Sequence, residues 1–253
     1  MTLTEALALK DREVISLVGG GGKTNLMFAL GKELLSYRKG IILTTTTKIW
    51  EPAGSALFAI FLSDQFSETE RWVKKNIDQH PCLLIAREKL SNGKLQGIPP
   101  QWIEEFQSFK DISTIVVEAD GAAGRSLKAP REGEPVVPQN TSLLIPVVGV
   151  DVLGRPLNEQ YVFRSEIAAR LLNLSIGSKV TEEVIAALLS EIIKSHPHKA
   201  RVIPFINKVD IPDGLEKARK LARYLLHIDR GQIERVILGQ AQGDPVVKEI
   251  IFC

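Results

Sequence analysis

The sequence is short of cysteine, tryptophan and net charge, and each shortage excludes a class of protein. Only Cys82 and Cys253 are cysteines among 253 residues, too few for a disulfide framework or a zinc knuckle, so we expect a reducing, cytoplasmic location. A formal net charge of +2 gives no strong field to attract nucleic acid. The three tryptophans are scattered and form no stacking platform for single strands. We therefore expect no nucleic-acid partner.

Long hydrophobic runs are also missing. The longest apolar stretch, SALFAIFL over Ser55–Leu62, is far shorter than the roughly 20 residues that a membrane helix needs. The first residues, MTLTEALALKDRE, have no charged start, no long apolar run and no small-residue cleavage site. We therefore expect neither membrane association nor a secretory signal.

What the sequence does contain is an alternation of short apolar runs with longer helical patterns. The expected strands are 14–18, 41–45, 56–62, 82–86, 113–120, 142–148, 201–206 and 235–238, the last two closing the sheet. The expected helices are 23–37, 68–77, 165–195 in two parts broken at 175–179, and 215–227. Unbroken apolar strands between helices predict an α/β fold with a mostly parallel sheet and helices on both faces. We expect a single domain over residues 1–253, with a small insertion around 66–109 as the alternative.

Four consecutive glycines followed by Lys-Thr-Asn stand between the first strand and the first helix. Four glycines lose much conformational entropy when the loop folds. Such a loop is expected where its backbone N–H groups must face an anion. The predicted nucleotide-binding residues are Gly19, Gly20, Gly21, Gly22, Lys23, Thr24 and Asn25. This order of strand, loop and helix predicts a P-loop NTPase-type fold, with Lys23 at the β- and γ-phosphates and Thr24 on Mg²⁺. Leu17 replaces the first glycine of the usual motif, so a plain glycine-rich turn is the alternative.

A second motif, FINKVD over Phe205–Asp210, follows a later strand. It has the Asn-Lys-x-Asp pattern by which GTPases read guanine, with Asn207, Lys208 and Asp210 as the pattern residues. The Asp210 carboxylate can accept two N–H groups from guanine, whereas adenine has no matching pair of donors. LGQAQG, over Leu238–Gly243, follows the last expected strand, where GTPases place a final base-contacting loop. The pattern favours GTP, ATP stays open, and a polar turn is the alternative.

The strand in TIVVEADG ends in two acids. Glu118 and Asp120 are two residues apart, so in an extended strand both point to the same side. Such a strand conventionally carries the carboxylate that holds Mg²⁺ beside the phosphate loop. We assign Thr24 and Glu118 to Mg²⁺ and Asp120 to the attacking water, with the reverse roles for the two acids left open. Together with Lys23, these acids are the candidate catalytic residues, and simple capping of a loop is the alternative.

Two further segments are candidates for a second substrate or for a switch. TTTTK, over Thr44–Lys48, follows the second strand, at the edge where open parallel sheets bind ligands. The loop GRSLKAPREGEPVVP, over Gly124–Pro138, carries cations just after the acidic pair. The candidate residues are Thr45, Thr46, Lys48, Arg125, Lys128 and Arg131. The alternatives are ordinary strand threonines and a solvated loop in which Glu132 and Glu134 balance the charge.

The segments LVGGGGKT, TTTTKIW, VVEADGAAGRSLKAPREGEPVVP and NKVD, in this order, resemble the selenium-dependent hydroxylase accessory protein family called YqeC. The resemblance spans most of the chain, and EADGAAGRSLKAP is its most specific part. It implies a role in maturing selenium-dependent molybdenum hydroxylases, with such an enzyme or its cofactor as partner. The motifs are also similar to GTPases that assist nickel insertion, but the Cys/His metal ligands of those proteins have no good counterpart here.

These observations support three functions. The first is a Mg²⁺-dependent NTP hydrolase, with GTP preferred, that gates maturation of a metalloenzyme. The second is a phosphotransferase or nucleotidyltransferase that acts on a small molecule similar to the molybdenum cofactor. The third is a nucleotide-dependent chaperone that does not hydrolyse its ligand. The oligomeric state stays open.

Overall fold

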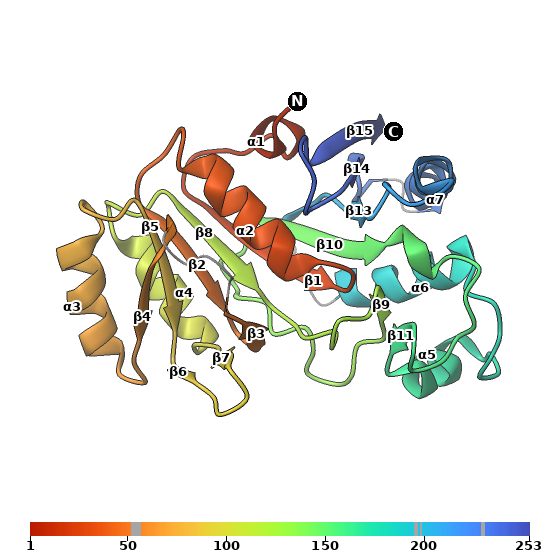
Figure 1. Cartoon of the computed structure of the whole chain (residues 1–253), viewed down its shortest axis with the longest axis horizontal. Coiled ribbons are helices and arrows are strands. Elements are labelled where there is room, and N and C mark those ends of the chain that lie inside the picture. The colour runs from red at the N-terminus through yellow and green to blue at the C-terminus, as the bar shows by residue number, and fades with distance from the viewer. Residues whose placement is uncertain (52–56, 195–196, 198, 229–230) are drawn as a thin grey trace.

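The computed structural model describes residues 1–51, 57–194, 197, 199–228 and 231–253, and Figure 1 shows its ribbon. A sheet of ten strands forms its centre, in the order β15-β14-β13-β10-β1-β8-β2-β5-β4, with β12 also paired to β10. These strands are β1 (Glu13–Gly19), β2 (Ile41–Thr45), β4 (Ala59–Leu62), β5 (Cys82–Ala86), β8 (Thr114–Glu118), β10 (Leu143–Gly149), β12 (Arg201–Val202), β13 (Phe205–Asn207), β14 (Arg235–Gly239) and β15 (Val247–Phe252). All pairings in this sheet are parallel except that of β14 with β15.

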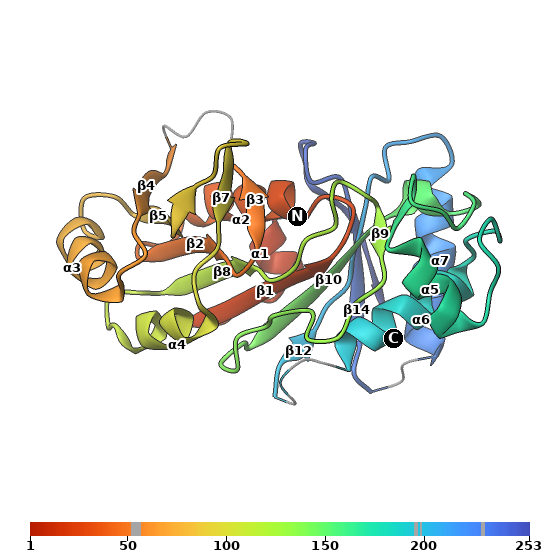
Figure 2. The same ribbon diagram turned by 90° about the horizontal axis from the view of Figure 1, so that it is seen from below.

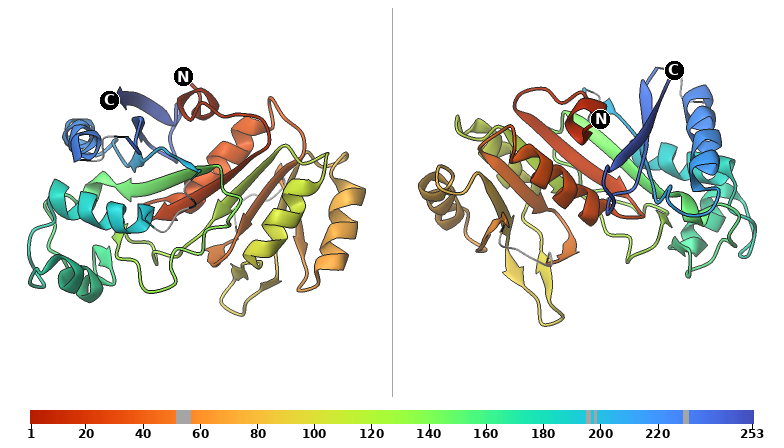
Figure 3. Two further views of the ribbon diagram at one scale, coloured as in Figure 1. Left: turned by 180° about the vertical axis from the view of Figure 1, so that it is seen from behind. Right: turned by 45° about the horizontal axis from the view of Figure 1, so that its top comes forward.

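Helices cover both faces of the sheet, as Figures 1 and 3 show from opposite sides. The helices are α1 (Leu3–Ala6), α2 (Lys23–Leu34), α3 (Phe66–Asn76), α4 (Pro100–Ser108), α5 (Ser165–Leu172), α6 (Glu182–Ile193) and α7 (Gly214–Ile228), with a short 3-10 turn, η2 (Val150–Val152). Alternate residues of β1 point to opposite faces: Val14 joins the core under α3, α4, α6 and α7, and Ile15 joins the core under α1 and α2. The predicted α/β fold, a mostly parallel sheet with helices on both faces, is confirmed.

The structure differs from the expected elements at several places. The strand expected over 201–206 is split into β12 and β13 around Pro204, because proline has no N–H to donate to the ladder. The expectation that 235–238 ends the sheet is wrong, since β15 adds an antiparallel edge strand after it. Helix α4 was not expected at all, although Pro100 stands in its first turn, a favoured place for proline.

Two small sheets flank the main one. The polar stretch after β5 forms a hairpin of β6 (Glu88–Lys89) and β7 (Lys94–Gln96), which pairs with β3 (Lys48–Trp50). On the other side, β9 (Leu127–Lys128) pairs with β11 (Val162–Phe163). Within the range 66–109, β5 belongs to the main sheet, and the division into a domain and an insertion stays a prediction.

The parallel strands bring the candidate residues to one edge of the sheet. Strands β1, β2, β8, β10 and β13 run in the same direction, so the loops that follow them meet at their carboxyl ends. In Figures 1 and 2, β3 and β7 lie on one side of β1 and β9 lies on the other. In the part of the chain that is described, no helix combines the length and the hydrophobicity needed to cross a bilayer.

Candidate functional site

The glycine loop leaves β1 and enters α2 through backbone conformations that favour glycine. Gly19, Gly21 and Gly22 have φ values of 92°, 81° and 120°. Leu17 lies inside β1 and is fully buried, so the missing glycine of the usual motif falls in the strand and not in the loop. A Cβ on Gly22 would lie 2.3 Å from Nδ2 of Asn207. The loop is therefore tightly packed as well as sterically restricted.

The N–H groups of this loop divide into two sets. Those of Gly19, Gly20 and Gly21 bond within the protein, to Asp120, to Val147 O and to Arg125 O respectively. The expectation that all loop N–H groups face an anion is therefore wrong for these three. The N–H groups of Gly22, Lys23, Thr24 and Asn25 have no acceptor among the described residues. They lie at the positive end of α2, so this half of the loop is the part suited to an anion.

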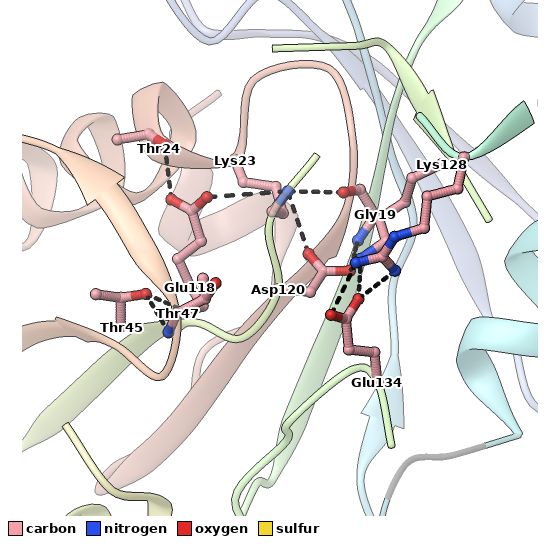
Figure 4. A network of polar contacts seen from close by, with 10 residues as sticks. Gly19, Lys23, Thr24, Thr45, Thr47, Glu118, Asp120, Lys128 and Glu134 are labelled. Atoms are coloured by element: carbon pink, nitrogen blue, oxygen red, sulfur yellow. Dashed lines mark hydrogen bonds and ion pairs between the residues drawn. The ribbon is translucent and has the colours of Figure 1, made fainter. Parts of the chain in front are cut away.

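Lys23 and Thr24 meet Glu118, the last residue of β8, and Asp120, which follows the strand, as Figure 4 shows. The strand expected over 113–120 therefore ends before Asp120. The Thr24 hydroxyl donates to Glu118 Oε2 at 2.6 Å. Lys23 Nζ donates to Gly19 O at 2.6 Å and lies 3.2 Å from Asp120 Oδ1 and 3.9 Å from Glu118 Oε1. Both acids are buried, and Asp120 Oδ1 accepts no hydrogen bond from the described residues. The predicted Mg²⁺ pair and the predicted catalytic acids therefore lie together at the glycine loop.

The environment of Glu118 sets its protonation. Burial raises the pKa of Glu118 above its usual value, and Lys23 and the Thr24 hydroxyl only partly oppose this. A cation bound beside Glu118 and Thr24 would favour the ionised carboxylate, because its positive charge offsets the hydration that the carboxylate loses on burial. The two oxygen donors fit Mg²⁺, which usually takes one or two protein oxygens and completes its shell with phosphate and water. The described residues contain no cluster of three or more His, Cys, Asp or Glu side chains placed to bind a metal by themselves.

A chain of ion pairs continues from Asp120 away from the loop. Lys128 Nζ lies 3.0 Å from Asp120 Oδ2 and 2.9 Å from Glu134 Oε2. Arg164 donates to both oxygens of Glu134, at 2.7 and 2.9 Å, and Arg131 pairs with it at 2.8 Å. Burial alone would raise the pKa of Glu134, but the hydrogen bonds from Arg164 and Lys128 outweigh this and lower the pKa to about 2.

The guanine-type motif forms one wall of a separate cavity of about 310 Å³. Asn207 bridges two loops, since Nδ2 donates to Gly21 O at 2.6 Å and Oδ1 accepts from the Ala241 N–H at 2.8 Å. The lining residues are Gly22, Asn25, Asn207, Lys208, Asp210, Ile211, Gln240, Ala241, Gln242 and Gly243. Lys208 Nζ, however, bonds to Ser126 and Asp151 at 2.7 and 2.9 Å. The structure thus brings both predicted base-contacting segments to the glycine loop.

A larger cleft of about 980 Å³ opens on the other side of the loop. Thr46, Lys48, Arg125 and Arg131 line it, as expected for residues that meet a second ligand. Thr45 does not line it, because its buried hydroxyl donates to Glu118 O and accepts from the Thr47 N–H.

Lys128 is also absent from the lining of this cleft. Its side chain is completely buried between two carboxylates, so it does not reach the cleft as a residue that contacts a second substrate would.

Several site residues were not found from the sequence. Arg164 lines the cleft and pairs with Glu134, yet it stands alone before α5 with no motif around it. Glu134 was visible only as a charge that balances the basic loop. A buried lysine needs a carboxylate partner, but the burial of Lys128 is not visible in the sequence, so no sequence signal points to Glu134. Trp50 and Lys94 line the cleft from the small sheet. The turn-rich stretch around Lys94 predicts a hairpin or an insertion loop, but no motif places either residue at the site.

Comparison with known proteins gives a consistent assignment. A family model described as YqeC protein matches residues 15–166, more than half of the chain. The Escherichia coli (strain K12) protein described as "Uncharacterized protein YqeC" is 29% identical over 243 residues, which cover 95% of this chain and 92% of the relative. The matched region contains the glycine loop, the acidic strand end and the ion pairs from Lys23 to Arg164. The chain belongs to the YqeC family.

Proposed function

We propose that the protein binds a nucleoside triphosphate with Mg²⁺ and hydrolyses it, with GTP preferred over ATP. The contact that carries this proposal is the 2.6 Å hydrogen bond from the Thr24 hydroxyl to Glu118. It places a loop hydroxyl and a strand carboxylate together, next to N–H groups that have no acceptor in the part of the chain that the structure describes. A plain glycine-rich turn needs no such pair of oxygens, whereas a Mg²⁺-phosphate site does.

Each buried group at this site has a distinct role in the proposal. Lys23 and the N–H groups of Gly22 and Thr24 stabilise the phosphate oxygens as negative charge develops on them. Thr24 and Glu118 hold Mg²⁺, which neutralises phosphate charge. Asp120 lines the cleft, and its buried Oδ1 lies 3.2 Å from Lys23 Nζ but accepts no hydrogen bond from the described residues. It can therefore accept a proton from a water molecule and orient that molecule toward the terminal phosphate.

The preference for guanine rests on the smaller cavity. Asp210 lines it, and Asn207 ties its wall to Gly21. A carboxylate at this place can accept both N–H groups on the guanine edge. A site that pairs with specific donors discriminates strongly against a base that lacks them, because its own polar group is then left without a partner.

The test is equilibrium binding of fluorescent GTP and ATP analogues, with and without Mg²⁺. The wild type is compared with Thr24→Val, Asp210→Asn and the control Asp213→Asn, which lies outside the lining of both cavities. We expect Thr24→Val to reduce the Mg²⁺ dependence of the affinity for both nucleotides. Asp210→Asn is expected to lower the affinity for GTP alone. Failure of the wild type to bind either nucleotide would overturn the proposal.

Release of phosphate decides between hydrolysis and the alternatives. The size of the larger cleft supports a phosphotransferase as second candidate, because water alone needs little room. Turnover of GTP by the isolated protein favours the hydrolase, and turnover only with an added acceptor favours the transferase. Tight binding without turnover in either case leaves the nucleotide-dependent chaperone.

The family resemblance extends the proposal to a cytoplasmic protein that assists maturation of a selenium-dependent molybdenum hydroxylase. The expected partner is the hydroxylase or its cofactor. If this is right, affinity for the apo-hydroxylase differs between the GTP-bound and the GDP-bound protein. Equal affinity in both states would remove the gating role and leave nucleotide binding untouched.

A further inference from the structure

The two cavities divide the space around the phosphate loop. The smaller one has the base-reading residues, and it shares Gly22, Asn25 and Lys208 with the larger one. Under the proposed function, the nucleoside occupies the smaller cavity and the phosphates lie at this shared boundary. Much of the 980 Å³ cleft is then unused by the nucleotide, and its volume is in the range of a full small-molecule site.

The unused part has an excess of cations. We call it the outer cleft and define it by four lining residues, Lys48, Trp50, Lys94 and Arg131. Lys48 is exposed and has no ion-pair partner among the described residues. Arg131, whose side chain is 64% exposed, pairs with Glu134 through Nε. Lys48 and Arg131 are exposed, so an anionic ligand can reach them. The exposed Glu132 also lines the cleft, but cations outnumber carboxylates in the lining as a whole.

Trp50 supplies a flat apolar surface beside these cations. It is 60% exposed, although most tryptophans are largely buried. Lys94, its cross-strand partner on β7, places Nζ 4.9 Å from the centre of the ring. The tryptophan belongs to neither hydrophobic core, so fold stability does not explain its place at the rim of the cleft. An exposed indole next to cations suits the face of an aromatic anion.

We propose that the outer cleft binds a second ligand together with the nucleotide, an anionic molecule with a planar aromatic ring. The ring stacks on Trp50, and its anionic group pairs with Lys48 and Arg131. This inference rests on the proposed function for the position of the nucleotide. The second substrate of the larger cleft then belongs to the class of anionic aromatic molecules.

The probe is flavin mononucleotide, whose ring fluorescence is quenched when it stacks on an indole and whose phosphate supplies the charge. Riboflavin, which has the same ring without the phosphate, is the matched ligand. We expect saturable binding of flavin mononucleotide, at least fivefold weaker binding of riboflavin, and no displacement by a non-hydrolysable GTP analogue with Mg²⁺. Trp50→Leu is expected to weaken binding roughly tenfold, the scale of one stacking contact.

Control variants separate the ligand site from the fold. Lys48→Gln, on the exposed rim, is expected to reduce the difference between flavin mononucleotide and riboflavin. Lys89→Gln, on β6 and outside the lining of the cleft, should change nothing. Displacement by the GTP analogue, absence of saturable binding, or unchanged binding in Trp50→Leu would overturn the outer-cleft proposal. Flavin binding that depends on Trp50 in a protein that binds no nucleotide would instead overturn the proposed function alone.

Discussion

Asp120 and Lys128 form an ion pair of 3.0 Å in which neither side chain is exposed to solvent. Lys23 approaches the other oxygen of Asp120, and Glu134 accepts from Lys128. A buried charge is tolerated when it is paired and becomes strongly destabilising when its partner is removed. The pair therefore links the glycine loop to the loop that carries Glu134.

The first prediction concerns removal of one charge of this pair. Lys128→Met leaves Asp120 with Lys23 alone, and we expect the free energy of unfolding to fall by about 3 kcal/mol. The double variant Asp120→Asn with Lys128→Met should recover most of this loss, because no uncompensated charge remains. Chemical denaturation of the four proteins of this cycle measures the coupling.

Arg131→Met is the control for this cycle. Arg131 also pairs with a carboxylate, Glu134, but its side chain is largely exposed. Its loss is therefore expected to change the stability by less than about 1 kcal/mol. A similarly small effect of Lys128→Met would contradict a structural role for the buried pair.

The fold was largely predictable because its determinants are local. Unbroken apolar strands such as Ile41–Thr45 and Cys82–Ala86 have the predicted bounds, since burial on both faces leaves a continuous apolar run. Strand β15 was missed because Val247–Phe252 is an edge strand with exposed and half-exposed positions. Its sequence therefore lacks the continuous apolar pattern of the central strands.

The candidate site was predictable only where a motif fixed it. The glycine loop, the acids Glu118 and Asp120, and Asn207 belong to motifs whose spacing is visible in the sequence. The parallel sheet brings these motifs to one edge. Lys128 and Arg164 could not be placed in this way. Whether a cation in a basic loop faces solvent or a buried carboxylate depends on the path of the loop, and that path depends on contacts 30 residues away, such as that of Arg164 with Glu134.

The second prediction uses the lowered pKa of Glu134. The pKa of Glu134 in the folded protein is about 2, below the usual value near 4.3. The ionised carboxylate therefore stabilises the folded protein at pH values above about 4.3. This contribution is lost as the pH falls toward 2. The difference in unfolding free energy between the wild type and Glu134→Gln should therefore shrink from pH 5 to pH 2.

Glu132→Gln is the matched control for the pH experiment, because Glu132 is an exposed residue of the same loop with no ion-pair partner among the described residues. Its stability should follow that of the wild type across this range. A constant difference between the wild type and Glu134→Gln would show that the ion pairs of Glu134 do not stabilise the folded protein.

The third prediction compares two glycines of the site. Gly22→Ala forces a side chain onto a φ of 120° and places Cβ 2.3 Å from Asn207 Nδ2. We expect it to abolish nucleotide binding and to destabilise the protein by about 1–3 kcal/mol. Gly121→Ala is the control, since the nearest atom to its Cβ would be Thr47 Oγ1 at 3.6 Å, an ordinary contact. Equal nucleotide binding by the two variants, measured by titration, would contradict this account of the loop.

The fourth prediction separates the two polar residues of the base-reading motif. Asn207 holds Gly21 O and the Ala241 N–H together inside the protein, whereas Asp210 is exposed and lines the smaller cavity. Asn207→Ala should therefore loosen the glycine loop and lower the affinities for GTP and ATP by similar factors. The two unpaired backbone groups should also lower the stability by about 1–3 kcal/mol.

Asp210→Ala should leave the stability and the affinity for ATP unchanged and weaken GTP on the order of a hundredfold, the effect of removing a charged acceptor from two donors. Parallel titrations with both nucleotides and a denaturation curve for each variant supply the comparison. If Asn207→Ala lowered the affinity for GTP alone, Asn207 would contact the base directly and its bridge between the two loops would be incidental. If Asp210→Ala weakened both nucleotides alike, the smaller cavity would not read the base.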